Sequence, residues 1–247
     1  MIDDWRYEPT PDFDKTPVAR LKDFPRHPDL FVYAARLVTN VLIRLWLRVY
    51  HRIEIVGREN LPATGSFVIV ANHASHVDAV TLLAALPLRL IHRAFPAAAA
   101  DYFFTNVPKI AFSAVVVNAM PFDRRENPKQ SIDLCRQVLA APGHMLIIFP
   151  EGTRTPDGEI GPFKPGIGFL TAGTTYPVVP CYLDGAYRAW AKGRFIPRPR
   201  KLRLAIGAPL TFADRRPEKT DAIAIAQSLR DAVAALEISL RSRDRNR

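Results

Sequence analysis

The sequence contains two cysteines among 247 residues, too few for a disulfide framework, which fits a reducing, cytosolic setting. Cys135 and Cys181 lie in apolar segments without a histidine nearby, so we interpret both as small core residues. Acidic residues are also outnumbered, since 24 Asp and Glu stand against 34 Lys and Arg and leave a formal net charge of +10. A chain of this charge favours polyanions such as nucleic acid, an anionic membrane surface or phosphorylated ligands.

Other signatures of function are missing as well. No Gly-x-Ser-x-Gly elbow occurs, which argues against a serine hydrolase. His73, His76 and Asp78 do not follow a usual metal-ligand spacing, and no metal site is expected. No aromatic-basic RNA signature or DNA-reading helix pattern is present, so we expect no nucleic-acid partner. The first six residues are polar and acidic, which is not typical of a signal peptide.

Apolar runs alternate with amphipathic stretches along most of the chain. The pattern predicts an α/β fold: a single domain over residues 51–247, with a mixed central sheet flanked by helices. We expect a charged loop at 120–125 and a short helix within 102–112. Strands are predicted at 52–57, 67–71, 115–117, 145–149, 178–183 and 202–206, and helices at 79–86, 130–139, just after 166, and 221–240.

The first 50 residues have a different character. Residues 1–30 are rich in proline and charge and are predicted to form an extended polar arm. Residues 31–50 form an apolar run in which Arg36, Asn40, Arg44 and Arg48 recur every four positions, which predicts an amphipathic helix. Twenty residues are long enough to span a bilayer, but each central arginine would cost about 2.5–3.5 kcal/mol there. We therefore predict a helix at the membrane interface, with its arginines in water; an ordinary core helix is the alternative.

The stretch that follows the predicted strand 67–71 carries the strongest chemical signal. His73 and Asp78 are five residues apart, so on one continuous helix they would point about 140° away from each other. They can meet only if His73 lies in a turn and Asp78 in the first turn of the next helix. The alternative is structural: Ser75 is a suitable N-cap, Asp78 completes a capping box, and His73 is a loop residue.

Four blocks in order resemble the glycerolipid acyltransferase family, whose best-known members are the 1-acylglycerol-3-phosphate acyltransferases. The first is Asn72-His73 with Asp78, and the second is the segment 121–124, ending in Arg124. The third is 149–154, with the segment 163–166 following it, and the fourth is 176–180. Together the blocks cover about residues 50 to 210.

The resemblance implies transfer of a fatty acyl group from acyl-CoA or an acyl carrier protein thioester to a lysophospholipid hydroxyl, most often that of 1-acylglycerol-3-phosphate. It implies His73 as general base, oriented by Asp78, and no cofactor. Lys164 is expected to contact the donor or the phosphate. The acceptor phosphate is expected to meet Arg124, Glu151, Gly152, Thr153 and Arg154, with Glu151 positioning one of the two arginines.

Several alternatives stay open at this point. The acceptor could be a lyso-ornithine lipid or another lysophospholipid, and an inactive basic protein that binds lipid or nucleic acid is the rival of a different class. We predict His76 to be structural or solvent-facing. Seven basic residues and no acid lie between Arg188 and Arg203, which indicates a solvated face, or a contact with anionic headgroups or with an acidic carrier protein. The predicted location is the cytoplasmic face of a membrane, peripheral or monotopic.

Overall fold

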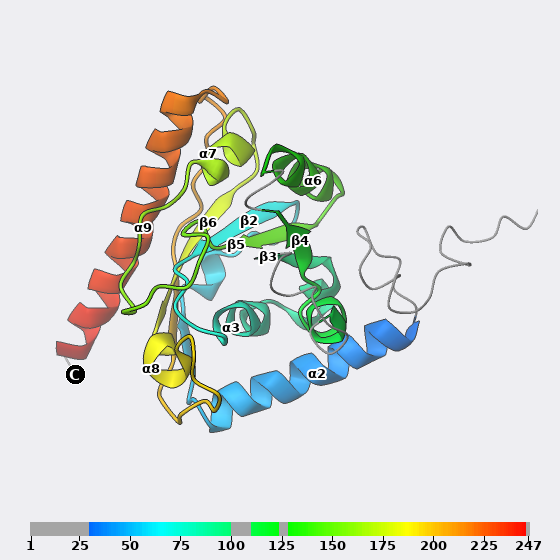
Figure 1. The fold of residues 1–247 in the computed structure, drawn as a ribbon, viewed down its shortest axis with the longest axis vertical. Coiled ribbons are helices and arrows are strands. Elements are labelled where there is room, and N and C mark those ends of the chain that lie inside the picture. The colour runs from blue at the N-terminus through cyan, green and yellow to red at the C-terminus, as the bar shows by residue number, and fades with distance from the viewer. Residues whose placement is uncertain (1–29, 100–109, 124–127, 246–247) are drawn as a thin grey trace, which may run out of the picture.

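Seven strands form one sheet in the order β1-β7-β6-β2-β5-β3-β4 (Figure 1). The computed structural model describes residues 30–99, 110–123 and 128–245. The strands are β1 (Glu54–Val56), β2 (Phe67–Ala71), β3 (Ala94–Ala99), β4 (Met120–Phe122), β5 (Met145–Ile148), β6 (Val178–Asp184) and β7 (Arg203–Ile206). The α-helices are α2 (Leu30–Val49), α3 (Asp78–Ala85), α6 (Pro128–Ala140), α7 (Gly166–Thr171), α8 (Ala186–Trp190) and α9 (Lys219–Arg245), with short helices η1 (Arg58–Asn60), η2 (Leu88–Arg93) and η3 (Phe112–Val116).

Strand β2 lies in the middle of the sheet, paired in parallel with β5 on one side and with β6 on the other. The β3 and β4 strands continue the parallel arrangement, whereas β7 pairs antiparallel with β6. The carboxyl ends of β2, β5 and β6 therefore meet at one edge of the sheet. Ligand sites of open α/β sheets lie at this edge.

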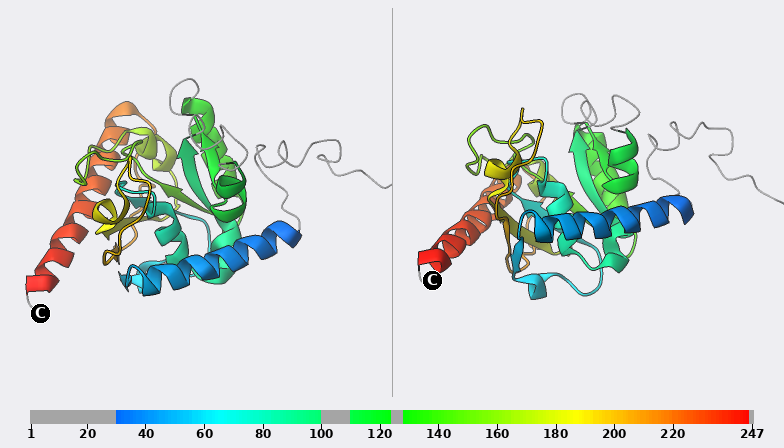
Figure 2. Two further views of the ribbon diagram at one scale, coloured as in Figure 1. Left: turned by 60° about the horizontal axis from the view of Figure 1, so that its bottom comes forward. Right: turned by 90° about the horizontal axis from the view of Figure 1, so that it is seen from below.

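The helices cover the two faces of the sheet in separate layers (Figures 1 and 2). All five residues of β2 are buried, because Phe67, Ile69 and Ala71 pack toward α3 while Val68 and Val70 pack toward α6, α7 and α9. Gly168 lets α7 approach α9 closely, since a Cβ atom there would lie 2.2 Å from the carbonyl oxygen of Ala222. The predicted single mixed α/β sheet flanked by helices is confirmed.

One local prediction is wrong. The valine-rich segment 115–117 was expected to form a strand, but residues 112–116 form a π-helix, and the strand is β4 at 120–122, where we expected a loop. The carbonyl oxygens of Ala114 and Val115 accept hydrogen bonds from the Arg36 guanidinium, both at 2.9 Å. A contact across almost 80 residues thus overrides the local β-propensity. Most of the helix expected at 102–112 lies outside the described residues, as does most of the predicted arm 1–30.

Helix α2 has the predicted length, but it faces the other way. Arg36 and Asn40 are 2% and 3% exposed, and Arg44 donates to the Asn40 side chain and to the carbonyl of Leu86. The polar stripe of α2 therefore packs against the rest of the domain, and of the three arginines only Arg48 is exposed. The expectation that all three arginines lie in water is corrected, because backbone carbonyls of the domain accept hydrogen bonds from Arg36 and Arg44.

The opposite face of α2 is apolar and exposed. Among the described residues this helix alone is long and apolar enough to cross a membrane, a test that buried core helices also pass. Here the apolar side chains point outward: Leu30, Phe31, Tyr33, Leu37, Val38, Val41, Leu42, Leu45 and Val49 are all exposed. A continuous apolar face of this kind marks an interaction surface.

Candidate active site

His73 and Asp78 meet at the carboxyl edge of the sheet. The turn after β2 brings the Nδ1 atom of His73 within 2.8 Å of the Oδ2 atom of Asp78, the first residue of α3. A carboxylate oxygen accepts, so Nδ1 carries the proton and Nε2 keeps its lone pair. The His73 ring also stacks on Phe149, with centroids 4.2 Å apart. The pair therefore has the geometry of a general base and the residue that orients it.

Asp78 also shapes the turn that carries His73. Its Oδ2 atom accepts hydrogen bonds from the backbone N–H groups of Ala74 and Ser75, each at 2.8 Å, and the residue is 1% exposed. Ser75 is not the N-cap that the structural alternative supposed: Val77 occupies that position, and the Ser75 hydroxyl donates to the carbonyl of Trp190. One carboxylate oxygen thus holds the turn and also contacts the imidazole.

The loop after β5 holds the backbone of His73 on both sides. The Glu151 carboxylate accepts from the His73 N–H at 3.0 Å, and the His73 carbonyl accepts from the Thr155 N–H at 2.9 Å. Burial raises the pKa of Glu151 to about 7, although its hydrogen bonds from His73 and Gly161 act in the opposite direction. We expected Glu151 to position an arginine at the acceptor phosphate; its side chain instead turns inward and positions His73.

The raised pKa of Glu151 predicts a pH-dependent stability. Between its ordinary value of 4.5 and about 7, the folded chain holds a proton that the unfolded chain has released. The free energy of unfolding should therefore fall as the pH rises through this window, by about 2 kcal/mol more than in Glu151→Gln, which does not titrate. Urea unfolding of both proteins at about pH 5 and about pH 7.5 measures the difference. Parallel changes in the two proteins would contradict the assignment.

The rest of the third block lines the opening of the site. Gly152 adopts a φ of +72°, a backbone conformation that favours glycine, and a Cβ atom there would lie 2.7 Å from the Nζ atom of Lys164. Thr153 is exposed at the surface. Arg124, the arginine of the second block, lies outside the described residues.

Arg154 and His76 form a contact that the sequence did not predict. The Nη1 atom of Arg154 lies 2.9 Å from Nδ1 of His76 and also contacts the other ring nitrogen. A guanidinium only donates, so His76 accepts as a neutral imidazole. Burial, reinforced by the Arg154 charge, lowers the pKa of His76 to about 4. His76 therefore belongs to the site; its spacing of three residues from His73 on the same turn was the signal that could have indicated it.

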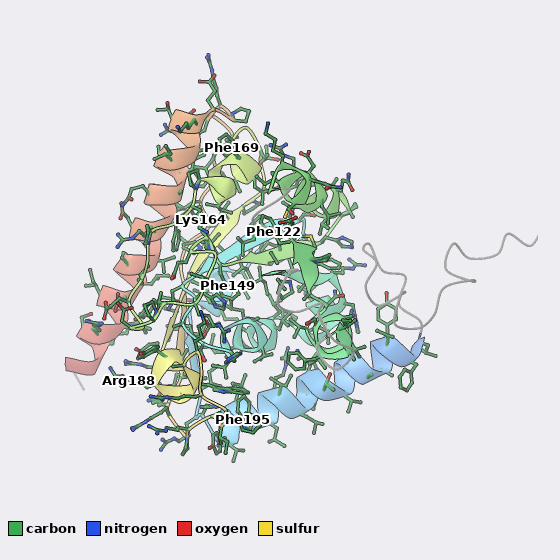
Figure 3. The ribbon with its side chains drawn as sticks, in the orientation of Figure 1. Phe122, Phe149, Lys164, Phe169, Arg188 and Phe195 are labelled. Carbon is green, nitrogen blue, oxygen red and sulfur yellow. The ribbon has the colours of Figure 1, made fainter. Side chains whose placement is uncertain are left out.

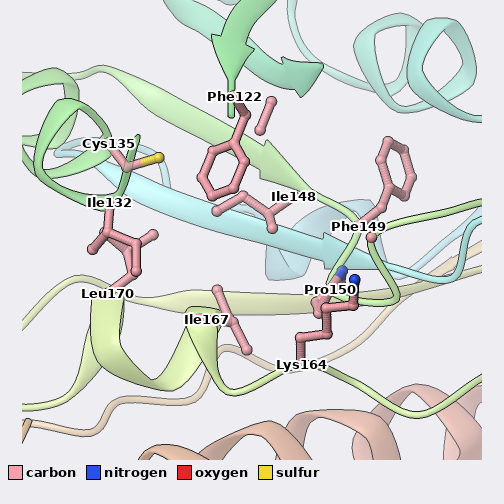
Figure 4. Close-up of a pocket in the computed structure, with 12 residues that line it drawn as sticks. Phe122, Ile132, Cys135, Ile148, Phe149, Pro150, Lys164, Ile167 and Leu170 are labelled. Atoms are coloured by element: carbon pink, nitrogen blue, oxygen red, sulfur yellow. The ribbon is translucent and has the colours of Figure 1, made fainter. Parts of the chain in front are cut away.

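Two apolar cavities flank this constellation, and Phe149 lines both. The cavity beside His73 has a volume of about 170 Å³ and is lined by His73, His76, Arg154, Trp190 and mostly apolar side chains from α3, β3 and η3. The second, of about 210 Å³, lies between β5, α6 and α7, with Lys164 at its end next to Pro150 (Figures 3 and 4). Within the described residues, no group of three His, Cys, Asp or Glu side chains could hold a metal ion.

A His–Asp pair at the carboxyl edge of a largely parallel sheet, beside an apolar cavity, has the geometry that general base catalysis on a hydroxyl group requires. The chain belongs to the Acyltransferase family, whose model matches residues 52–184. It is 32% identical to the 1-acyl-sn-glycerol-3-phosphate acyltransferase of Bacillus subtilis over 191 residues, which cover 76% of this chain and 89% of that protein. The family predicted from the four blocks is therefore confirmed.

Two further comparisons agree with this placement. A chloroplastic 1-acyl-sn-glycerol-3-phosphate acyltransferase of Brassica napus is 30% identical over 66% of this chain, and the chain spans about half of that protein, 47%. The crystal structure of the 1-acyl-sn-glycerophosphate acyltransferase PlsC of Thermotoga maritima matches with a TM-score of 0.64 and 23% identity, covering 84% of this chain and 79% of that one. The second likeness confirms the predicted fold class.

Proposed function

We propose that the protein transfers a fatty acyl group from a thioester, either acyl-CoA or acyl carrier protein, to the free hydroxyl of 1-acylglycerol-3-phosphate and forms phosphatidate. The observation that carries this proposal is the 2.8 Å contact between His73 and Asp78 at the wall of an apolar cavity that also contains Arg154. A cavity of this composition fits a substrate with both a fatty chain and a phosphate. The names of the relatives support the same acceptor.

The reaction follows from the atoms of His73. Nδ1 is held by Asp78, so Nε2 takes the proton of the acceptor hydroxyl as its oxygen attacks the thioester carbonyl. The C–S bond then breaks, and the imidazolium returns the proton to the departing thiolate. The acceptor oxygen does the work that a serine does in a hydrolase triad, so no acyl-enzyme forms. Because the base is a side chain and the thioester is already activated, the proposed reaction requires no cofactor.

Arg154 is the described residue best suited to the acceptor phosphate. Its guanidinium lies in the wall of the cavity that contains His73, and neutral His76 supports it without competing for the anion. A planar guanidinium binds two phosphate oxygens at once. Arg124 remains a proposed second ligand on the grounds of its block alone. The exposed Thr153 hydroxyl, Gly152 and Lys164 are proposed to line the path of the phosphate or of the donor.

Arg154→Lys should raise the acceptor KM by about tenfold, because the bidentate fork is lost while one charge remains. The donor KM should stay unchanged. Steady-state kinetics in which acceptor and donor are varied separately measures both constants, and Arg136→Lys, an exposed change on α6, serves as the control. If only the KM of the acyl donor changed, Arg154 would be assigned to the binding site of the donor and not to that of the acceptor phosphate.

We also propose that the enzyme lies on a membrane surface as a peripheral or monotopic protein, on its cytoplasmic face. The support is the exposed apolar face of α2 and the net charge of +10, which attracts anionic lipids. In this arrangement the apolar side chains of α2 enter the lipid, and its buried arginines hold the domain against the helix. The acceptor is a membrane lipid, so an enzyme at this depth reaches it directly.

A panel assay tests the proposed function. The purified protein is mixed with acyl-CoA or acyl carrier protein thioester and with lysophosphatidate, other lysophospholipids or a lyso-ornithine lipid, and products are identified by mass spectrometry. Phosphatidate should form fastest. If another lysolipid were acylated and lysophosphatidate were not, the acceptor would have to be reassigned while the acyl transfer stood.

A further inference from the structure

The segment between α8 and β7 exposes two large apolar side chains next to each other. Phe195 is 93% exposed, more than any other large apolar residue in the described part of the chain, and Ile196 is 70% exposed. Large apolar side chains at the tip of a loop are costly in water unless they have a partner. We call residues 192–201 the basic loop.

Cations surround this apolar pair. Lys192, Arg194, Arg198 and Arg200 are all exposed, and no ion pair within the described residues involves Lys192, Arg198 or Arg200. An apolar tip with a collar of cations matches the boundary of an anionic bilayer, where hydrocarbon lies just below a layer of phosphates. Charge alone would also suit an acidic carrier protein, but the exposed Phe195 and Ile196 favour lipid.

The basic loop is continuous with the apolar face of α2. The Tyr50 hydroxyl, just beyond the C-terminal end of α2, donates to the carbonyl of Pro197 at 2.9 Å. His51 donates from Nδ1 to the carbonyl of Arg200, also at 2.9 Å. In Figure 3, Phe195 lies at the C-terminal end of α2, on the edge of the molecule where the α2 side chains project into solvent. The apolar face of α2 and the basic loop can therefore contact the same membrane surface.

The other end of the basic loop is attached to the active site. The indole N–H of Trp190 donates to the carbonyl of Arg194 at 2.9 Å. The carbonyl of Trp190 accepts from the Ser75 hydroxyl at 2.8 Å, and the Trp190 ring lies 5.2 Å from that of His76. Trp190 also lines the cavity beside His73. The base of the loop thus forms part of the wall of the site.

We propose that the basic loop is a second membrane contact, in which Phe195 and Ile196 enter the hydrocarbon boundary of an anionic bilayer and the surrounding cations bind its headgroups. Together with α2 it makes a two-point contact, which fixes the rotation of the domain about the α2 axis. The cavity wall formed by Trp190 and His76 is then held toward the lipid that supplies the acceptor. This inference rests on the proposed function only in taking the acceptor to be a membrane lipid.

Vesicle flotation of the full chain tests the proposal. Phe195→Ser with Ile196→Ser should lower partitioning onto mixed phosphatidylcholine and phosphatidylglycerol vesicles by about tenfold or more. Lys192→Gln with Arg198→Gln should lower it by about tenfold on those vesicles and leave binding to phosphatidylcholine alone unchanged. That second loss should disappear at high salt, since the headgroup attraction is screened.

Matched controls come from elements other than α2 and the basic loop. Ile223→Ser with Ile238→Ser removes two exposed apolar side chains from α9, and Lys129→Gln with Lys219→Gln removes two charges near the ends of α6 and α9. These variants should bind vesicles like the unmodified protein. Leu42→Ser with Leu45→Ser on α2 is the positive control. Full vesicle binding by the Phe195 and Ile196 variant would overturn the proposal.

Activity measurements separate this inference from the proposed function. With a short-chain, monomeric lysophosphatidate and acyl-CoA, the basic-loop variants should keep their turnover and lose it only with acceptor embedded in vesicles. If they bound vesicles normally but failed with acyl carrier protein thioester alone, the loop would be a carrier site and the membrane contact would be wrong. If no lysolipid were acylated by any variant or by the unmodified chain, the proposed function would fail, while flotation would still decide the loop.

Discussion

His73→Ala is expected to lower kcat by about 10²–10⁴-fold, the usual contribution of a positioned general base. The acceptor and donor KM values should change little, because the imidazole acts on the hydroxyl proton and binds neither the fatty chain nor the phosphate. The backbone of residue 73 keeps its bonds to Glu151 and Thr155 in this variant, so the turn should persist.

Two measurements make this result interpretable. Urea unfolding should show that the His73→Ala protein remains folded. His144→Ala is the matched control, since His144 comes just before β5, at the other end of that strand from Glu151. It should keep full activity. A folded His73→Ala protein that turned over normally would remove His73 from the mechanism.

Asp78→Asn is expected to lower kcat by about 10²–10⁴-fold, because the base stays in place but loses its charge partner. The Oδ2 atom accepts three N–H groups, from His73, Ala74 and Ser75. An amide oxygen can replace it for the backbone donors, but it provides no negative charge to stabilise the imidazolium. If the amide N–H₂ turns toward His73, it selects the tautomer in which Nε2 carries the proton and cannot act as a base.

Asp78→Ala separates the two roles of the carboxylate. This change removes the cap of the turn as well as the charge, so it should lower the free energy of unfolding by about 1–3 kcal/mol more than Asp78→Asn does. Asp133→Asn, which alters an exposed carboxylate paired with Arg136 on α6, is the control for both measurements. Equal activity of Asp78→Asn and the unmodified protein would mean that the carboxylate only caps the turn.

The contact between His73 and Asp78 could be predicted because its determinants are local. An apolar strand, a turn and a helix start lie within twelve residues, 67–78, and the buried ends of β2 and α3 leave the turn little freedom. The same holds for β5, β6 and β7, which begin and end within two residues of the predicted bounds. In these segments the apolar pattern alone decides the structure.

The wrong predictions, for the orientation of α2 and for the segment 115–117, concern structure that depends on contacts with residues distant in sequence. Periodicity showed that Arg36 and Asn40 share one side of α2, but it could not show whether that side faces water or protein. The acceptors that turn it inward are carbonyls of Ala114 and Val115, almost 80 residues away. The same contact accounts for the π-helix at a segment whose valines predict a strand. Every residue has a backbone carbonyl, so a sequence pattern cannot show which carbonyls will accept a hydrogen bond from a distant side chain.

The remaining differences within the site have a similar cause. Glu151 belongs to the third block, whose pattern indicates a role near the phosphate, yet its side chain is buried and accepts a hydrogen bond from the N–H group of His73. His76 has no block position, and only the packing of the loops after β2 and β5 brings it to Arg154. The sequence thus indicated which loops lie together at the carboxyl edge of the sheet, while the direction of each side chain depended on how those loops pack.

Release of free thiol from acyl-CoA, followed with and without lysophosphatidate, tests the direct transfer at His73 most simply. The unmodified protein should release thiol only when the acceptor is present, in step with phosphatidate formation, and the His73→Ala protein should do so about 10²–10⁴-fold more slowly. Thiol release at the same rate without acceptor, or a burst that leaves an acylated protein, would contradict transfer directly onto the lipid hydroxyl.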